Sequence, residues 1–305
     1  MKLRNKIVLG TIAIMLLLSL FLAWSYPSAQ DLMPGNPFWN GLSDFSRIAQ
    51  AEMRGSLDRV GTPQNTVLIA ISYTPYRSDE LERIKQFILD GGIVAILDDF
   101  GQGNSILTYL GLKVRFSGSP MLDPLFNFKN SELPKVTAFE GRLKEKGLGS
   151  VLLNRPSVLL NVETFSVLAL SSETSFLDTN RNRSPDRNEP RGPFPVAAEM
   201  SLSKGKLVLI SDASMVSNSM IGQDDNYRFL EEVLGLSGKY VIIDGAHIPN
   251  STLDRAKRGL AQTRSVLSGY YPLTILVLAV LALALRPLWI QRNIQGENRR
   301  KNQTN

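Results

Sequence analysis

Cysteine is absent from this chain of 305 residues, and histidine occurs once, at His247. The absence of cysteine excludes disulfides, thiolate metal sites and a cysteine nucleophile. A single histidine excludes a metal site built from several imidazoles. The sequence also lacks a basic stripe interleaved with aromatic residues, although its formal net charge is +6. The excess bases flank the apolar ends of the chain, so we expect no nucleic-acid partner.

Long apolar stretches stand near both ends of the chain. Residues 7–24 carry no charge and follow Lys2, Arg4 and Lys6, and a second apolar stretch covers residues 270–285. A helix of about 20 apolar residues spans a bilayer, so both stretches predict transmembrane helices. For the first stretch the alternative is a cleaved signal peptide, and its length favours an uncleaved anchor. The bases before the first stretch predict a cytoplasmic N-terminus. The expected location is therefore the cell membrane, with two spans, both termini cytoplasmic and the main domain extracytoplasmic.

These stretches divide the chain into six expected parts. They are an N-terminal transmembrane anchor (1–25), a linker with three prolines (26–40), an extracytoplasmic α/β domain (41–250), a juxtamembrane helix (251–268), a C-terminal transmembrane helix (269–290) and a cytoplasmic tail (291–305).

Short apolar runs alternate with helical patterns inside the expected domain. The runs have the length of strands and are rich in β-branched residues: 66–72, 93–97, 205–212 and 240–243. Such runs are typical of strands buried on both faces of a parallel sheet. A helical pattern over residues 78–89 separates the first two runs. The order of strand, helix and strand predicts an α/β fold with a flavodoxin-like parallel sheet.

Acidic residues follow three of these strands. Asp98 and Asp99 end one, Asp212 ends another, and Asp244 ends the last. The carboxyl ends of parallel strands meet at one edge, so we expect a polar-ligand site there. The full set of candidate ligand-binding residues is Asp98, Asp99, Asn104, Asp212, Asp244 and His247. The alternative is that the aspartates cap the following helices and that His247 is a hydrogen-bonded structural residue.

Residues 178–189 fit a twelve-residue calcium loop. The oxygen ligands expected from the spacing are Asp178, Asn180, Asn182, Asp186 and Glu189. Arg183 stands where such loops need glycine for a sharp turn, and the three arginines of the loop oppose cation binding. The alternatives are a weak extracellular calcium site and a solvated loop that matches the pattern by chance.

Several motifs between the two apolar stretches carry a family resemblance. They are DDFGQGN, FSGSPMLDPLF, DTNRNRSPDRNEPRGPFPVAAE, LVLISDASMVSNSMI, DDNYRFLEEVLG and IIDGAH. Together they resemble a prokaryotic, mostly archaeal, membrane-anchored domain-of-unknown-function family with a class I glutamine-amidotransferase-like fold. The resemblance implies a flavodoxin-like sheet, and partners among MoxR-type ATPases and von Willebrand A-domain proteins. Glutamine amidotransferases use a cysteine nucleophile, whereas the matching position here holds Asp98 and Asp99, which excludes glutaminase chemistry.

We therefore expect a membrane-anchored, non-catalytic binding or scaffold module. The alternative is a metal-assisted hydrolase that uses the aspartates at the carboxyl edge of the sheet. A third interpretation is a purely structural partner in a membrane complex.

Overall fold

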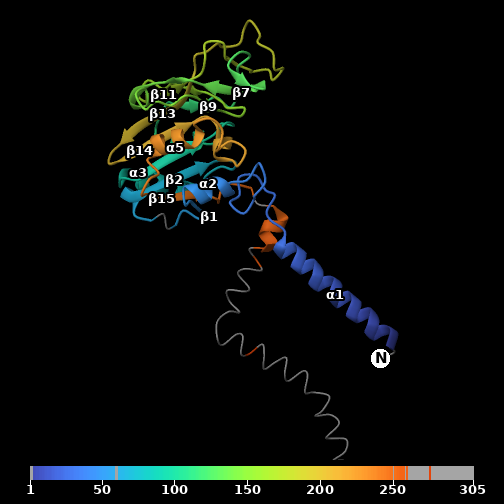
Figure 1. The fold of residues 1–305 in the computed structure, drawn as a ribbon. Coiled ribbons are helices and arrows are strands. Elements are labelled where there is room, and N and C mark those ends of the chain that lie inside the picture. The colour runs from blue at the N-terminus through green and yellow to red at the C-terminus, as the bar shows by residue number, and fades with distance from the viewer. Residues whose placement is uncertain (1–2, 59–60, 250, 258, 260–274, 276–305) are drawn as a thin grey trace, which may run out of the picture. The chain divides into compact units, whose positions relative to one another are not determined.

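The computed structural model describes residues 3–58, 61–249, 251–257, 259 and 275 (Figure 1). The chain divides into two compact units, one made of residues 26–250 and one made of residues 1–25 with 251–305. The described part of the second unit contains one long helix, α1 (Leu3–Ser25).

The predicted N-terminal membrane span is wrong. In the described part of the chain, no helix has both the length and the apolar character needed to cross a bilayer. The predicted membrane location, with cytoplasmic termini and an extracytoplasmic domain, is corrected for the same reason. The ranges 251–268, 269–290 and 291–305 lie largely outside the described residues.

A mixed sheet of eight strands forms the centre of residues 26–250. In spatial order these are β1 (Glu52–Arg54), β15 (Tyr240–Asp244), β2 (Thr66–Ile71), β3 (Ile93–Leu97), β14 (Gly205–Ile210), β13 (Pro195–Leu202), β11 (Ser166–Leu170) and β8 (Ala138–Phe139). The first five run parallel to one another, and each of the last three is antiparallel to the strand before it. The predicted flavodoxin-like parallel sheet is therefore wrong, and the fold is α/β with a mixed sheet.

The antiparallel half begins at a tight hairpin. Leu202 of β13 lies opposite Gly205 of β14, so only two residues connect these strands. Ser203, the first of them, has a φ of 56°. A connection this short reverses the chain and forces antiparallel pairing. Residues 195–202 interrupt their apolar pattern with Glu199 and Ser201, so they do not form the continuous apolar run that identifies the parallel strands.

Helices cover both faces of the sheet. They are α2 (Ser43–Ile48) and α5 (Asn226–Leu234) on one face, and α3 (Ser78–Leu89) and α4 (Asn104–Tyr109) on the other. Val67, Ile69 and Ile71 of β2 pack in the core that contains α2 and α5. Leu68 and Ala70 of the same strand pack in the core that contains α3 and α4. Successive side chains of a strand point to opposite faces of the sheet. Because helices cover both faces, all six residues of β2 are buried.

A β-rich part lies beside the sheet. Its strands are β4 (Arg115–Phe116), β5 (Met121–Leu122), β6 (Asn127–Phe128), β7 (Asn130–Val136), β9 (Val151–Leu152), β10 (Leu159–Leu160) and β12 (Phe176–Leu177). Short 3-10 helices occur at three places in the described part of the domain as a whole: η1 (Pro63–Asn65), η2 (Gly141–Leu143) and η3 (Ala213–Val216). The short strands pair as β6–β7–β9, β10–β4 and β12–β5. The loops between them reach the carboxyl edge of the main sheet, where Ser157 donates a backbone hydrogen bond to Ser211.

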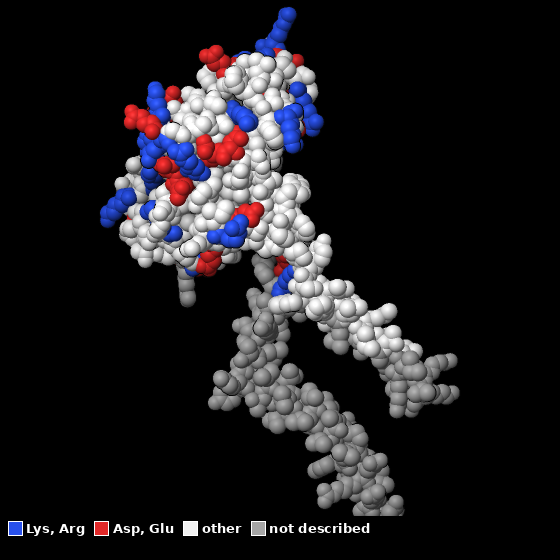
Figure 2. Space-filling model, viewed as in Figure 1, with Lys and Arg blue, Asp and Glu red and all other residues white. Residues whose placement is uncertain are grey.

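The surface of this unit is mixed in charge. Figure 2 shows acidic and basic side chains interspersed over much of the visible face of residues 26–250. The net positive charge of the sequence is thus not gathered into a single field on that face.

Candidate functional site

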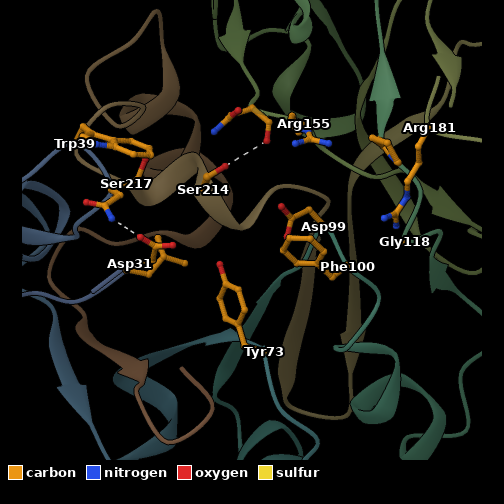
Figure 3. A pocket seen from close by; sticks show the side chains of 14 residues that line it. Asp31, Trp39, Tyr73, Asp99, Phe100, Gly118, Arg155, Arg181, Ser214 and Ser217 are labelled. Atoms are coloured by element: carbon orange, nitrogen blue, oxygen red, sulfur yellow. Dashed lines mark hydrogen bonds between the residues drawn. The ribbon is translucent and has the colours of Figure 1, made fainter. Parts of the chain in front are cut away.

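A pocket of about 430 Å³ opens at the carboxyl edge of the sheet (Figure 3). This volume suits a small molecule. The segment before α2, the ends of β2 and β3, the β-rich part and the region of η3 all contribute to its wall. The lining residues are Asp31, Leu32, Trp39, Asn40, Tyr73, Asp99, Phe100, Gly118, Pro120, Asn154, Arg155, Arg181, Ser214 and Ser217.

Asp99 is the predicted ligand-binding residue that lines this pocket. Its Oδ1 atom is buried and has no hydrogen-bond partner. Burial raises the pKa of Asp99 to about 8, with smaller contributions from the charges of Asp212 and Asp98, while Arg155 acts in the opposite direction. At neutral pH the side chain is therefore mostly a neutral carboxyl, which can both donate and accept a hydrogen bond.

Asp98 is not among the residues that line the pocket, and it organises the turn after β3. Its Oδ1 accepts hydrogen bonds from the backbone N–H groups of Phe100 (2.8 Å) and Gly101 (2.9 Å). Its Oδ2 accepts one from the N–H of Gly103 at 2.6 Å. Burial raises the pKa of Asp98, and these three hydrogen bonds oppose that rise. Both carboxylate oxygens are occupied, so Asp98 acts as a structural cap.

Asp212 and Asn104 are also bonded within the fold. Asp212 accepts from the N–H (2.8 Å) and Oγ (2.6 Å) of Ser214 and from the N–H of Asn154 (2.7 Å), so it caps η3. Burial raises its pKa to about 6, against these hydrogen bonds. The Asn104 amide exchanges two hydrogen bonds of 2.9 Å with the backbone of Phe116. Asn104 thereby joins α4 to β4.

Asp244 and His247 belong to a separate buried cluster at the end of β15. The Oδ2 atom of Asp244 lies 2.7 Å from Nδ1 of His247 and accepts a 2.9 Å hydrogen bond from the Tyr76 hydroxyl. Nε2 of His247 lies 3.4 Å from Glu80, and its ring stacks on Tyr76 with 3.6 Å between centroids. Burial lowers the pKa of His247, but the Asp244 and Glu80 carboxylates outweigh that effect and raise it.

The predicted calcium loop is organised by its own hydrogen bonds. Asp178 is buried, and its two oxygens accept from the backbone N–H groups of Asn182 (3.1 Å) and Arg183 (3.0 Å). The side-chain amides of Asn180 (2.7 Å) and Asn182 (2.8 Å) both donate to Asp186. Arg183 has a φ of 62°, so it adopts the left-handed conformation that glycine usually supplies at this loop position.

Glu189 closes the same loop. Its Oε1 accepts from the N–H of Thr179 at 2.8 Å, and its Oε2 accepts from the N–H of Asp186 at 3.1 Å. Among the residues that the structure describes, no group of three or more His, Asp or Glu side chains is placed to hold a metal ion. Calcium binding by this loop stays a prediction.

The segment predicted as a linker contributes to the pocket. Leu32 is buried and donates a 2.8 Å backbone hydrogen bond to Asn40. The Asn218 amide donates to the backbone oxygen of Phe38 at 2.6 Å, which ties this segment to the region after η3. Trp39 lies on the pocket wall and is 71% exposed. A tryptophan within a proline-rich segment was the sequence signal that could have identified this wall.

Two arginines on the pocket wall were not singled out from the sequence. Arg155 and Arg181 lie on one side of the pocket, opposite Trp39 and Asp31 (Figure 3). Both arginines have left-handed backbones, with φ values of 50° and 61°. No sequence motif indicates that these two arginines line a pocket, because their backbone conformation arises only when the β-rich part folds.

Solved structures show distant similarity to this chain. The mmIFT52 N-terminal domain matches over 60% of this chain and 82% of that chain, with 11% identity and a TM-score of 0.44. A beta-galactosidase from Bacillus circulans sp. alkalophilus matches over 55% of this chain and 22% of its own, with 14% identity and a TM-score of 0.33. Cytoplasmic Protein STM3548 from Salmonella typhimurium matches over 63% and 76%, with 11% identity and a TM-score of 0.34. These similarities are too low to support a functional argument.

No match is found among curated proteins. A family model, in contrast, matches residues 34–234, which is more than half of the chain. This range includes Asp99, Arg155 and Arg181, and it confirms the predicted resemblance at the level of a domain-of-unknown-function family. The chain belongs to the family of the domain of unknown function DUF4350.

Proposed function

We propose that this chain is a non-catalytic binding module that takes a small ligand in the pocket at the carboxyl edge of its sheet. The buried Oδ1 of Asp99, which has no hydrogen-bond partner, carries this proposal. Buried polar atoms are nearly always hydrogen-bonded in folded proteins, so an unpartnered one on a residue that lines a pocket supports a ligand site at that residue. A ligand hydroxyl or amide matches a neutral carboxyl at this position.

Aromatic side chains support the same proposal. The rings of Tyr73 and Phe100 lie 6.0 Å apart on the pocket wall, and Trp39 presents an exposed ring on another part of the wall. Burial, followed by the charge of Asp99, raises the pKa of Tyr73, so its hydroxyl stays protonated and can donate. Apolar rings beside a few directed polar groups are typical of small-molecule sites.

The alternative, a metal-assisted hydrolase, has less support. Asp98, Asp212 and Asp244 each accept hydrogen bonds from donors of the same chain, so they are committed to the fold. A binding role needs none of these three carboxylates to be free. We also propose that the domain is related to the glutamine amidotransferases. Asp98 and Asp99 support this proposal, because they follow β3 at the position that matches the nucleophile of those enzymes.

The test is a ligand screen on the full chain. Thermal unfolding with a library of small polar metabolites should identify compounds that raise the midpoint of the wild-type protein. Isothermal titration should then show at least a tenfold loss of affinity in Asp99→Ala, about 1.4 kcal/mol of binding free energy. Asp90→Ala, at an exposed residue after α3, is the matched control and should bind normally. Compounds that bind both variants equally well would refute a role for this pocket.

The scaffold role also remains part of the proposal. The family resemblance implies partners among MoxR-type ATPases and von Willebrand A-domain proteins. Affinity capture of the intact protein with identification of the bound chains tests that implication, and recovery of neither class would reject it.

A further inference from the structure

We infer that the ligand of this pocket carries an anionic group, a carboxylate or a phosphate, which is held between Arg155 and Arg181. The inference rests on the proposed binding role and adds the chemical class of the ligand. Figure 3 shows both guanidinium groups on the same side of the pocket, while Trp39 and Asp31 lie on the other side.

The arginine side of the pocket has few neutralising partners. Glu132 forms salt bridges with two arginines. Its Oε1 lies 3.6 Å from Nε of Arg155 and 3.2 Å from Nε of Arg183. Within the described residues, Arg181 forms no salt bridge. Asp99 adds little negative charge at neutral pH because its carboxyl is mostly protonated. Positive charge therefore exceeds negative charge on this side. The planar fork of a guanidinium matches a carboxylate or phosphate with two parallel hydrogen bonds.

The backbone holds both arginines in strained conformations. A left-handed conformation is unfavourable for a residue with a side chain, and such strain tends to occur at functional sites. The N–H of Arg155 donates a 2.8 Å hydrogen bond to the oxygen of Glu132, which fixes one arginine. Arg181 is fixed by the loop 178–189, because the backbone on its C-terminal side is bound by the buried Asp178. The loop thus has a role that needs no calcium, namely to present Arg181 to the pocket.

The remainder of the wall indicates what the rest of the ligand offers. Trp39 provides an aromatic face, and Asp31, which accepts a hydrogen bond from Asn40, can accept another from a ligand hydroxyl. Suitable probes are therefore pairs of hydroxylated ring compounds in which one member carries a carboxylate and the other a neutral hydroxymethyl group at the same position. D-glucuronate with D-glucose is one pair, and 4-hydroxybenzoate with 4-hydroxybenzyl alcohol is another. D-glucose 6-phosphate separates phosphate from carboxylate as the preferred anion.

Isothermal titration on the full chain gives the first result. The charged member of a pair should bind at least tenfold more tightly than its neutral partner. Raising sodium chloride from about 0.05 to 0.5 M should weaken the charged member only, because salt screens exposed charges.

Arg181→Gln is the informative variant, and Arg187→Gln is its control. Arg187 is exposed on the same loop and does not line the pocket, so both variants lose one positive charge. Arg181→Gln should lose at least tenfold affinity for the charged probe and keep its affinity for the neutral one, whereas Arg187→Gln should behave like the wild type. Equal losses of affinity in both variants, or neutral probes that bind as tightly as charged ones, would refute the inference that the ligand is anionic. The proposed binding role would not be affected by these outcomes. Absence of binding by every probe and by every compound of the metabolite screen would overturn both.

Discussion

Two neighbouring carboxyls at the end of β3 have different tasks. Asp98 accepts three backbone hydrogen bonds from the turn that follows it. Asp99 lines the pocket, and its Oδ1 atom is buried without a hydrogen-bond partner. Substitution of Asp98 should therefore lower the stability of the fold. Substitution of Asp99 should change how stability depends on pH and should weaken ligand binding.

Asp99→Asn should change how stability depends on pH. The folded state holds the Asp99 proton up to about pH 8, whereas an ordinary aspartate releases it near 3.8. Stability contributed by this residue is thus greatest below pH 3.8 and is lost as pH rises toward 8. Asparagine resembles the neutral carboxyl, so the stability advantage of the variant over the wild type should grow between pH 5 and pH 9 by at least about 1.4 kcal/mol, the value of one pKa unit. Urea unfolding at both pH values measures this, and parallel wild-type and variant curves would contradict it.

Asp98→Asn should destabilise the fold at every pH. The amide nitrogen of asparagine cannot accept a hydrogen bond, so at least one buried N–H of the turn loses its partner, at a cost of about 1–3 kcal/mol. Urea unfolding at pH 7 provides the measurement. Unchanged stability would show that the turn does not depend on this carboxylate.

The elements differ in how far the sequence predicts them. Residues 93–97 form β3 and residues 78–89 form α3, as the continuous apolar run and the helical pattern predict. β13 was not predicted, because Glu199 lies within its pattern and forms salt bridges with Arg142 and Lys206. Partners of this kind, distant in sequence, cannot be recognised from local periodicity.

The candidate site shows the same division between local and distant information. The spacing rule located Asp99, because it depends only on a strand and its end. Trp39 and Arg155 reach the pocket from parts of the chain that pack against the sheet only after folding. Their roles depend on long-range geometry, which composition and spacing do not contain.

Gly235→Ala should destabilise the end of α5. Gly235 follows the helix with a φ of 61°, a conformation that costs alanine about 1 kcal/mol more than glycine. Gly222→Ala is the control, since open space surrounds its Cβ position and its φ lies outside the left-handed region. Denaturant unfolding should separate the two variants, and equal stability would argue against a backbone effect.

The loop 178–189 permits a separate test of calcium. Its amides donate to Asp186, so binding would require the amide groups of Asn180 and Asn182 to turn their oxygens inward. We expect an affinity no tighter than the ~0.1–1 mM of extracellular modules. At ten times the dissociation constant this stabilises the fold by about 1.4 kcal/mol. This stabilisation is measured by thermal unfolding with calcium or with chelator, in the wild type and in Glu189→Gln. An unchanged midpoint would support the alternative interpretation, a solvated loop that binds no calcium.

At the scale of the whole molecule, residues 26–250 contain both apolar cores and every residue of the pocket. We expect this fragment to fold alone with a single cooperative unfolding transition and to keep the ligand affinity of the full chain. Circular dichroism and titration provide the comparison. A fragment that aggregates or unfolds in two steps would show that the domain needs the rest of the chain.

The place of β15 in the sheet has a consequence for synthesis. This strand lies between β1 and β2, although it is the last strand among the residues that the structure describes. Until residues 240–244 have left the ribosome, β2 keeps a bare apolar edge and β1 has no neighbour to pair with. The sheet therefore cannot be completed until residues 240–244 have been made, and contacts this distant in sequence also form slowly. A chain that terminates before residue 240 would expose the β2 edge to other copies, so premature termination should produce aggregates and not a smaller folded protein.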